Sequence, residues 1–154
     1  MNDQAQTTDR LLLRRDADSV AWLTLNRPAA RNALSLGLMQ ALVAELAAID
    51  ADPSVKVVVI GGAGPAFCAG HDLRELRSNP DRAAYEATFQ LCSQLMTAIV
   101  RLPKPVIARV HGVATAAGCQ LRRFSFSQFM AQAKATPAST VIGGMTKMKC
   151  RMPL

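Results

Sequence analysis

The stretch Val55–Gly62 reads Val-Lys-Val-Val-Val-Ile-Gly-Gly and decides the class of the fold. Its β-branched residues follow one another without polar alternation and two glycines bound the run, which predicts a buried strand over Val55–Ile60. Before it, Ser35 is a predicted N-cap for a helix that runs to about Ala51. Asp52-Pro53-Ser54 ends that helix, so the chain passes from a helix directly into a buried strand.

Further strands and a second helix flank this unit. Leu11–Leu13 and Val20–Leu25 are predicted strands, joined through a turn at Asp16-Ala17-Asp18. Helical spacing returns from Asp81 to Leu102, and Val106–Val110 is a further short buried strand. The apolar stripe expected on the second helix comprises Tyr85, Phe89, Cys92, Leu95 or Met96, and Ile99. The order strand, strand, helix, strand, loop, helix, strand predicts an α/β fold.

Composition excludes several classes of protein. The 154 residues are one domain's worth, with 50% hydrophobic and 19% charged residues. No apolar run approaches the ~20 residues that a membrane span needs, so no membrane association is expected. The acidic N-terminus lacks the apolar region of a secretory signal and the basic, acid-poor composition of a transit peptide, which predicts a cytoplasmic protein. The cysteines form no C-x-x-C pair, so inert thiols and no metal site are expected.

The charge is distributed unevenly along the chain. Residues 1–121 hold 12 basic and 11 acidic side chains, whereas residues 122–154 hold six basic side chains and no acid. Most of the formal net charge of +7 therefore belongs to the last segment. We interpret 1–121 as a partial domain and 122–154 as a basic tail of unknown structure, produced by a frame change or an alternative end. A native tail with its own function is the alternative.

Two segments carry the predicted chemistry. Ala66–Leu73, which reads Ala-Phe-Cys-Ala-Gly-His-Asp-Leu, follows one buried strand, and His111–Leu121 follows the next. Small side chains allow a ligand to approach the backbone closely, and free N–H groups at a helix start favour negative charge. Two such loops can direct two N–H groups at one carbonyl oxygen, as in an oxyanion hole. Tight packing between strand and helix is the alternative reading for either loop alone.

These segments resemble the crotonase family, also called the enoyl-CoA hydratase/isomerase family. The matching blocks are Leu25–Pro28 with Arg31–Leu34, then Ala66–Leu73, then Lys104–Ala108 with His111–Leu121. The sequences of the last two blocks resemble those of the enoyl-CoA hydratase domain-containing branch of the family. The resemblance covers residues of about 10–121 and implies the N-terminal part of a crotonase-like ββα spiral, followed by a non-family tail.

The resemblance also implies roles for individual residues. The backbone N–H groups of His71 and Ala117 fall on the two oxyanion donors of the family. The segment that contacts the phosphates and adenine of coenzyme A matches Arg31, Ala33 and Leu34. The rim of the coenzyme A groove matches Ala69, Asp72 and Leu73. The implied ligand is an acyl-CoA or enoyl-CoA thioester, with coenzyme A as part of the substrate and no separate cofactor. Full-length relatives form trimers or hexamers.

The sequence departs from the family at Gln120, the position of the first of two glutamates that hydratases use as acid and base. An amide cannot transfer a proton at neutral pH. The second glutamate lies in a region that this sequence does not reproduce, so a weakly active or inactive protein is expected. A non-enzymatic fragment is one alternative. Nucleic-acid binding through the basic tail is a weaker one, because the tail matches no known nucleic-acid-binding fold.

Overall fold

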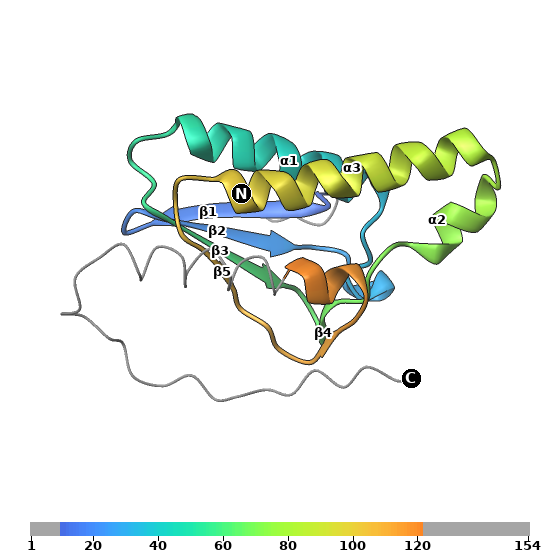
Figure 1. Ribbon diagram of the computed structural model, residues 1–154. Helices are drawn as coiled ribbons and strands as arrows, with labels where there is room; N and C mark the ends of the chain where they lie inside the picture. Colours follow the sequence, from blue (N-terminus) through green and yellow to red (C-terminus); the bar gives the residue numbers. More distant parts are fainter. Residues whose placement is uncertain (1–9, 122–154) are drawn as a thin grey trace, which may run out of the picture.

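Two helices lie side by side over one face of a four-stranded sheet in the computed structural model, which describes residues 10–121 (Figure 1). The helices are α1 (Leu36–Ala51) and α3 (Arg82–Arg101). The strands, in spatial order, are β1 (Leu12–Ala17), β2 (Val20–Leu25), β3 (Val57–Gly62) and β5 (Val106–Ala108). The α/β class expected from the sequence is therefore confirmed.

Strand pairing follows the connections between the strands. β1 and β2 form an antiparallel hairpin, while β2–β3 and β3–β5 are parallel pairs connected across the sheet through the helices. The hairpin turns at Asp18 and Ser19, whose φ angles of 53° and 62° suit a tight turn between twisted strands. The turn therefore lies slightly later than the predicted Asp16-Ala17-Asp18.

The core lies between the sheet and the two helices. Alternate residues of the strands meet the buried stripe of α1, and among them Leu23 and Ile60 are each 1% exposed. The Ser35 hydroxyl accepts a hydrogen bond from the N–H of Leu38 at 3.2 Å, which confirms the predicted N-cap. Packing against these helices covers the apolar inner face of the sheet.

The predicted stripe on α3 is wrong at Phe89. The buried residues of this helix are Thr88, Cys92, Leu95, Met96 and Ile99, whereas Phe89 is 54% exposed. Thr88 can take the buried position because its hydroxyl donates to the carbonyl of Ala84 at 2.9 Å, which satisfies its polar group within the helix. Phe89 is thereby left on the side of α3 that faces the functional loops.

Several short elements escaped prediction from the sequence. β4 (Ala66–Cys68) and β6 (Val113–Ala114) form a separate two-stranded parallel sheet. A 3-10 turn, η1 (Pro28–Ala30), follows β2, and α2 (Leu73–Ser78) precedes α3. These elements are too short to leave a periodic pattern. No helix in the described part of the chain has both the length and the apolarity to cross a bilayer. The basic tail expected at 122–154 lies outside the described residues.

Candidate functional site

The loop Ala69–Asp72 is hydrogen-bonded to the turn Arg31–Leu34 along its length. The N–H of Ala69 donates to the carbonyl of Arg31 at 3.0 Å, the N–H of Leu34 to Gly70 at 2.8 Å, and the N–H of Asp72 to Leu34 at 3.0 Å. In a trans peptide the C=O and N–H groups point in opposite directions. Since the carbonyl of Gly70 points to Leu34, the N–H of His71 in the same peptide points away from it.

The second loop places another N–H group at the start of a helical turn. The N–H of Thr115 donates to the carbonyl of Cys68 at 3.1 Å, and the Thr115 hydroxyl donates to that of Ala69 at 2.9 Å. A helical turn then begins at Ala117, where backbone N–H groups have no partner within the helix. Within residues 10–121, neither the N–H of Ala117 nor that of His71 donates a hydrogen bond.

Two glycines bring these loops into contact. A Cβ added at Gly70, where φ is +90°, would lie 3.0 Å from the Cβ of Ala116 and 3.6 Å from the nitrogen of Ala117. A Cβ added at Gly118 would lie 2.4 Å from the carbonyl oxygen of Cys68. Only glycine permits so close an approach. The two N–H groups without partners in the described residues therefore belong to loops that touch.

Asp72 fixes the end of the first loop. One carboxylate oxygen accepts from the N–H groups of Arg74 at 3.1 Å and Glu75 at 3.4 Å, and so caps α2. The other accepts from a guanidinium nitrogen of Arg27 at 2.8 Å. Burial opposes ionisation of this carboxyl, but the hydrogen bonds and the charge of Arg27 together hold the pKa of Asp72 below its usual range. Its side chain is thus engaged within the protein.

The remaining residues expected at the coenzyme A groove differ in exposure. Arg31 and Leu73 are exposed, Leu73 at 64%, and Ala69 is half-buried. Ala33 and Leu34 are buried, so the polar groups that they offer are those of the backbone. The guanidinium of Arg31 makes no ion pair with any described residue. Gln120 is exposed, and its N–H donates to the carbonyl of Ala116 at 3.3 Å.

Sequence reasoning missed the role of Asn32, whose side chain holds the segment that leads into the first loop. This side chain is fully buried; its amide nitrogen donates to the carbonyls of Ala63 and Ala66, both at 2.8 Å, and its oxygen accepts from the N–H of Arg27 at 2.9 Å. The φ angle of Asn32 is +54°, a conformation that asparagine adopts more readily than most residues. The sequence offered no local signal for this role, because the carbonyls that Asn32 holds lie more than 30 residues away in the chain.

The imidazole of His71 contacts α3. Its ring meets Phe89 edge to face, with centroids 5.3 Å apart and planes inclined at 78°. Its Nδ1 is buried and has no hydrogen-bond partner within the described residues. Burial lowers the pKa of His71, so the ring is neutral at pH 7. The structure thus places a neutral ring, rather than a cation, at the edge of the site.

We expect the free energy of unfolding to fall as the pH drops below about 6.5, the ordinary histidine value. Because the folded-state pKa of His71 is lowered, the unfolded chain binds the proton first and acidification favours unfolding. His71→Gln should remove this slope, measured by urea denaturation between pH 7.5 and 5. His111→Gln is the control, since it removes the other histidine. A slope that survives in His71→Gln but vanishes in His111→Gln would contradict the assignment.

The thiols and carboxylates of the region suggest neither nucleophilic nor metal chemistry. Cys68 and Cys92 are buried and Cys119 is half-buried, and none of the three forms a disulfide with another described residue. Burial raises the pKa of Cys68 to about 11 and also raises that of Cys92, so both stay protonated at neutral pH. Over residues 10–121, no three side chains of His, Cys, Asp or Glu gather closely enough to hold a metal. Cys150 lies outside the described residues.

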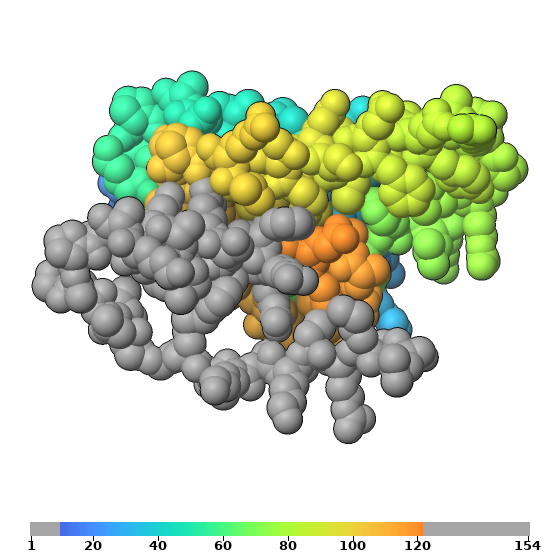
Figure 2. Space-filling view, in the orientation of Figure 1, coloured from blue at the N-terminus to red at the C-terminus, as the bar shows by residue number. Residues whose placement is uncertain are grey.

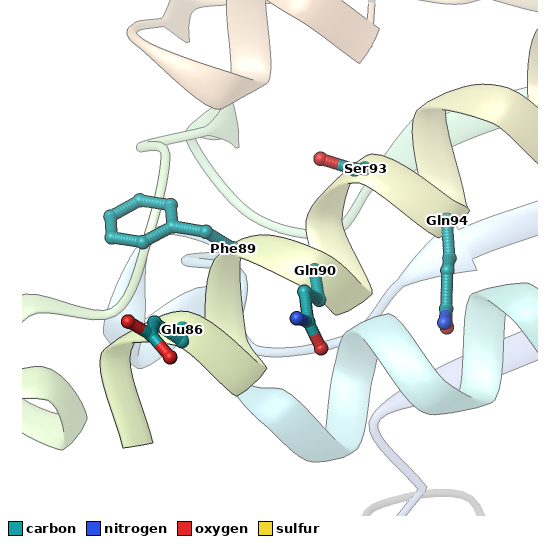
Figure 3. A pocket seen from close by; sticks show the side chains of 5 residues that line it. All are labelled: Glu86, Phe89, Gln90, Ser93 and Gln94. Carbon is teal, nitrogen blue, oxygen red and sulfur yellow. The ribbon is translucent and has the colours of Figure 1, made fainter. Parts of the chain in front are cut away.

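A shallow hollow runs along the outer side of α3, next to His71. Its lining residues are Glu86, Phe89, Gln90, Ser93 and Gln94 (Figure 3). Phe89 projects away from the side of the helix on which Gln90 and Gln94 lie, and its ring is the one that contacts His71. The orange segment that ends at Leu121 is exposed on the same face of the molecule as α3 (Figure 2). The hollow therefore borders the site and is lined mainly by polar side chains.

Comparison with known proteins gives one consistent result. The family model of enoyl-CoA hydratase/isomerase matches residues 15–149. The chain is 39% identical over 116 residues to the rat (Rattus norvegicus) enoyl-CoA hydratase domain-containing protein 3, mitochondrial, and 45% identical over 102 residues to the 2,3-dehydroadipyl-CoA hydratase of Escherichia coli K12. These alignments cover 75% and 66% of this chain.

Solved structures show the same similarity in three dimensions. The enoyl-CoA hydratase of Mycobacterium smegmatis superposes with a TM-score of 0.72 at 54% identity, covering 73% of this chain and 44% of that one. Human enoyl-CoA hydratase domain-containing protein 3 gives a TM-score of 0.69 at 40% identity, with the same coverage. The chain spans 39% of the length of each of the two curated relatives. The family model match continues past Leu121.

Proposed function

The chain belongs to the enoyl-CoA hydratase/isomerase family, and from this premise we propose that it binds an acyl-CoA or enoyl-CoA thioester. The thioester carbonyl oxygen lies between the N–H groups of His71 and Ala117, which polarise the carbonyl and stabilise negative charge that develops on its oxygen. One observation carries this proposal: two N–H groups without partners in the described residues come from two loops in contact.

Electrostatic stabilisation is the contribution that such a site can make. An enolate places negative charge on one oxygen, and two fixed donors in a dry site are worth several kcal/mol toward that charge. The donors are backbone groups, so the side chains at these positions are free to vary. The His71 ring is neutral and packs against Phe89, so in this proposal the stabilisation comes from the two N–H groups and not from a cation on His71.

Coenzyme A supplies binding contacts remote from the reacting carbonyl. Arg31 is exposed, has no ionic partner among residues 10–121, and sits in the turn that is bonded to the His71 loop. A phosphate on this guanidinium fixes one end of the ligand while the carbonyl binds at the other, and such positioning contributes to catalysis. Coenzyme A enters as part of the substrate, and no resident cofactor is proposed.

We propose binding and carbonyl polarisation without efficient hydration. Gln120 occupies the place where the hydratases of the family carry an acid or base, and an amide supplies none of the proton transfer that contributes roughly 10²–10⁴-fold to rates. Crotonyl-CoA should therefore bind without appreciable loss of its enoyl absorbance. Turnover similar to that of an ordinary hydratase would contradict this part of the proposal.

Binding is best tested with two ligands that differ only at the carbonyl. Butyryl-CoA carries the thioester oxygen, whereas S-butyl-CoA replaces the carbonyl by a methylene group. By calorimetry, butyryl-CoA should bind the full chain about tenfold more tightly, which equals about 1.4 kcal/mol and is typical of one or two hydrogen bonds. Equal affinities would show that no donor reaches the carbonyl, and absence of binding by both would overturn the proposal altogether.

A further inference from the structure

Arg27 connects three parts of the site through one side chain and its own backbone. One guanidinium nitrogen donates to the carbonyl of Ala33 at 2.5 Å and another to the carboxylate of Asp72 at 2.8 Å. Its backbone N–H donates to the side-chain oxygen of Asn32, and its carbonyl accepts from the N–H of Asn32, both at 2.9 Å. Arg27 is therefore held at both ends.

Both partners of the ion pair are largely shielded from water. The side chains are 21% exposed for Arg27 and 12% for Asp72. Screening by solvent is weak at such positions, and a charge-assisted hydrogen bond there is stronger than one at the surface. Removing either partner leaves the other charge partly buried and unpaired, which is costly. The pair is consequently a firm link between the turn before Leu34 and the loop after Gly70.

The link acts next to the peptide that carries the proposed donor. His71 lies between Gly70 and Asp72, so the direction of its N–H depends on how the 70–71 peptide is held. Gly70 is flexible by nature, and its carbonyl is held by one hydrogen bond, from the N–H of Leu34. Without Arg27, the bond from the N–H of Asp72 to the carbonyl of Leu34 remains, but the carboxylate of Asp72 loses its tie to the guanidinium that also holds the carbonyl of Ala33. The 70–71 peptide is then held less firmly and gains freedom to turn its carbonyl toward the ligand.

We propose that Arg27 and Asp72 form a positioning pair that aims the N–H of His71 at the thioester carbonyl. This inference rests on the proposed function and adds a residue to it. Arg27 touches no reacting atom; it acts through Asp72 and the peptide of His71. A forked guanidinium is needed because it serves the carbonyl of Ala33 and the carboxylate at the same time.

The test measures carbonyl polarisation separately from ligand affinity. Butyryl-CoA labelled with ¹³C at the carbonyl is bound to the full chain, and the carbonyl stretching band is recorded by infrared difference spectroscopy. Hydrogen bonding to the oxygen lowers the frequency of this band. Affinity for S-butyl-CoA, which lacks the carbonyl, reports on the rest of the groove. A structural role alone would change both readouts together.

Two single variants approach the pair from opposite sides. Arg27→Gln removes the cation, while Asp72→Asn removes the anion but keeps an oxygen that can still cap α2. We expect each to lose most of the band shift, and the double variant to lose no more of it than either. Arg27→Gln, which lies outside the expected coenzyme A contacts, should keep the affinity for S-butyl-CoA within about threefold. Arg27→Lys should recover part of the shift, because the ammonium still pairs with Asp72.

Arg14→Gln is the matched control. Arg14 is 23% exposed and bonds to the carboxylates of Asp16, Glu45 and Asp52, away from the two loops, so its loss should lower the melting temperature and leave the band shift intact. A wild-type chain without a band shift would overturn the proposed function itself. A wild-type shift that persists in Arg27→Gln would overturn only the positioning role. The positioning role would also be overturned if either single variant unfolded, or if both single variants lost S-butyl-CoA binding. Either result would show that the pair has a structural role.

Discussion

Gly70→Ala is expected to abolish the carbonyl band shift of bound butyryl-CoA and to destabilise the chain by about 2–4 kcal/mol. Gly70 has a φ of +90°, which side chains with a Cβ adopt at a cost. The added methyl would lie 3.0 Å from the Cβ of Ala116 and 3.2 Å from the carbonyl oxygen of Thr115. Relief of this contact should move the two loops apart, so the two N–H groups would no longer reach the one oxygen at which we propose they bind.

Gly61→Ala is the matched control for this variant. Gly61 is also buried, but its φ angle lies outside the strained range, and an added Cβ would lie 3.5 Å from the flexible side chain of Arg109. The Gly61→Ala protein should keep a carbonyl band shift for bound butyryl-CoA and a urea unfolding midpoint close to those of the wild type. A Gly70→Ala protein that polarises the carbonyl as strongly as wild type would show that the contact between the loops does not set the donor geometry.

Asn32→Ala is expected to reduce the free energy of unfolding by about 3–5 kcal/mol. The substitution removes three hydrogen bonds and leaves the carbonyls of Ala63 and Ala66 and the N–H of Arg27 without this partner. Alanine also loses the preference of asparagine for a φ of +54°. Urea denaturation monitored by circular dichroism measures the loss.

Two other variants sharpen this experiment. Asn32→Asp keeps the shape and the acceptor for Arg27 but places an oxygen against two carbonyl oxygens, so it should be at least as destabilising as alanine. Asn26→Ala is the comparison, because the Asn26 side chain is half-buried rather than fully buried and donates to the carbonyl of Arg10 at 2.9 Å, so its loss should cost less than that of Asn32. Equal losses for Asn32→Ala and Asn26→Ala would refute the supporting role of Asn32.

The local signals in the sequence predicted the long elements well. Ser35 caps α1, α1 ends at Ala51, and α3 lies within the predicted range from Asp81 to Leu102. Caps, proline breaks and β-branched runs act over a few residues, so they can be recognised without knowing the fold. The predicted strand Val55–Ile60 lies two residues later, as Val57–Gly62, because its register is set by pairing with β2.

The short elements and the buried polar network could not be predicted in this way. β4 and β6 have three and two residues, too few for a period, and they exist because they pair with each other. Phe89 was expected in the core and lies instead against His71, since Thr88 satisfies its hydroxyl within the helix. Asn32 and Arg27 act on partners up to 45 residues away, and no local pattern marks such a pairing.

The sequence by itself determined that the chain is an α/β protein and that His71 and Ala117 lie in two small-residue loops, because both properties depend on neighbouring residues. Only the tertiary structure decided that their N–H groups have no partner within the described part of the chain and that they belong to loops in contact. The direction of the His71 N–H follows from the hydrogen bond between Leu34 and Gly70, and the contact follows from the packing of Gly70 against Ala116. Both depend on segments that are distant in the chain and meet only when it folds.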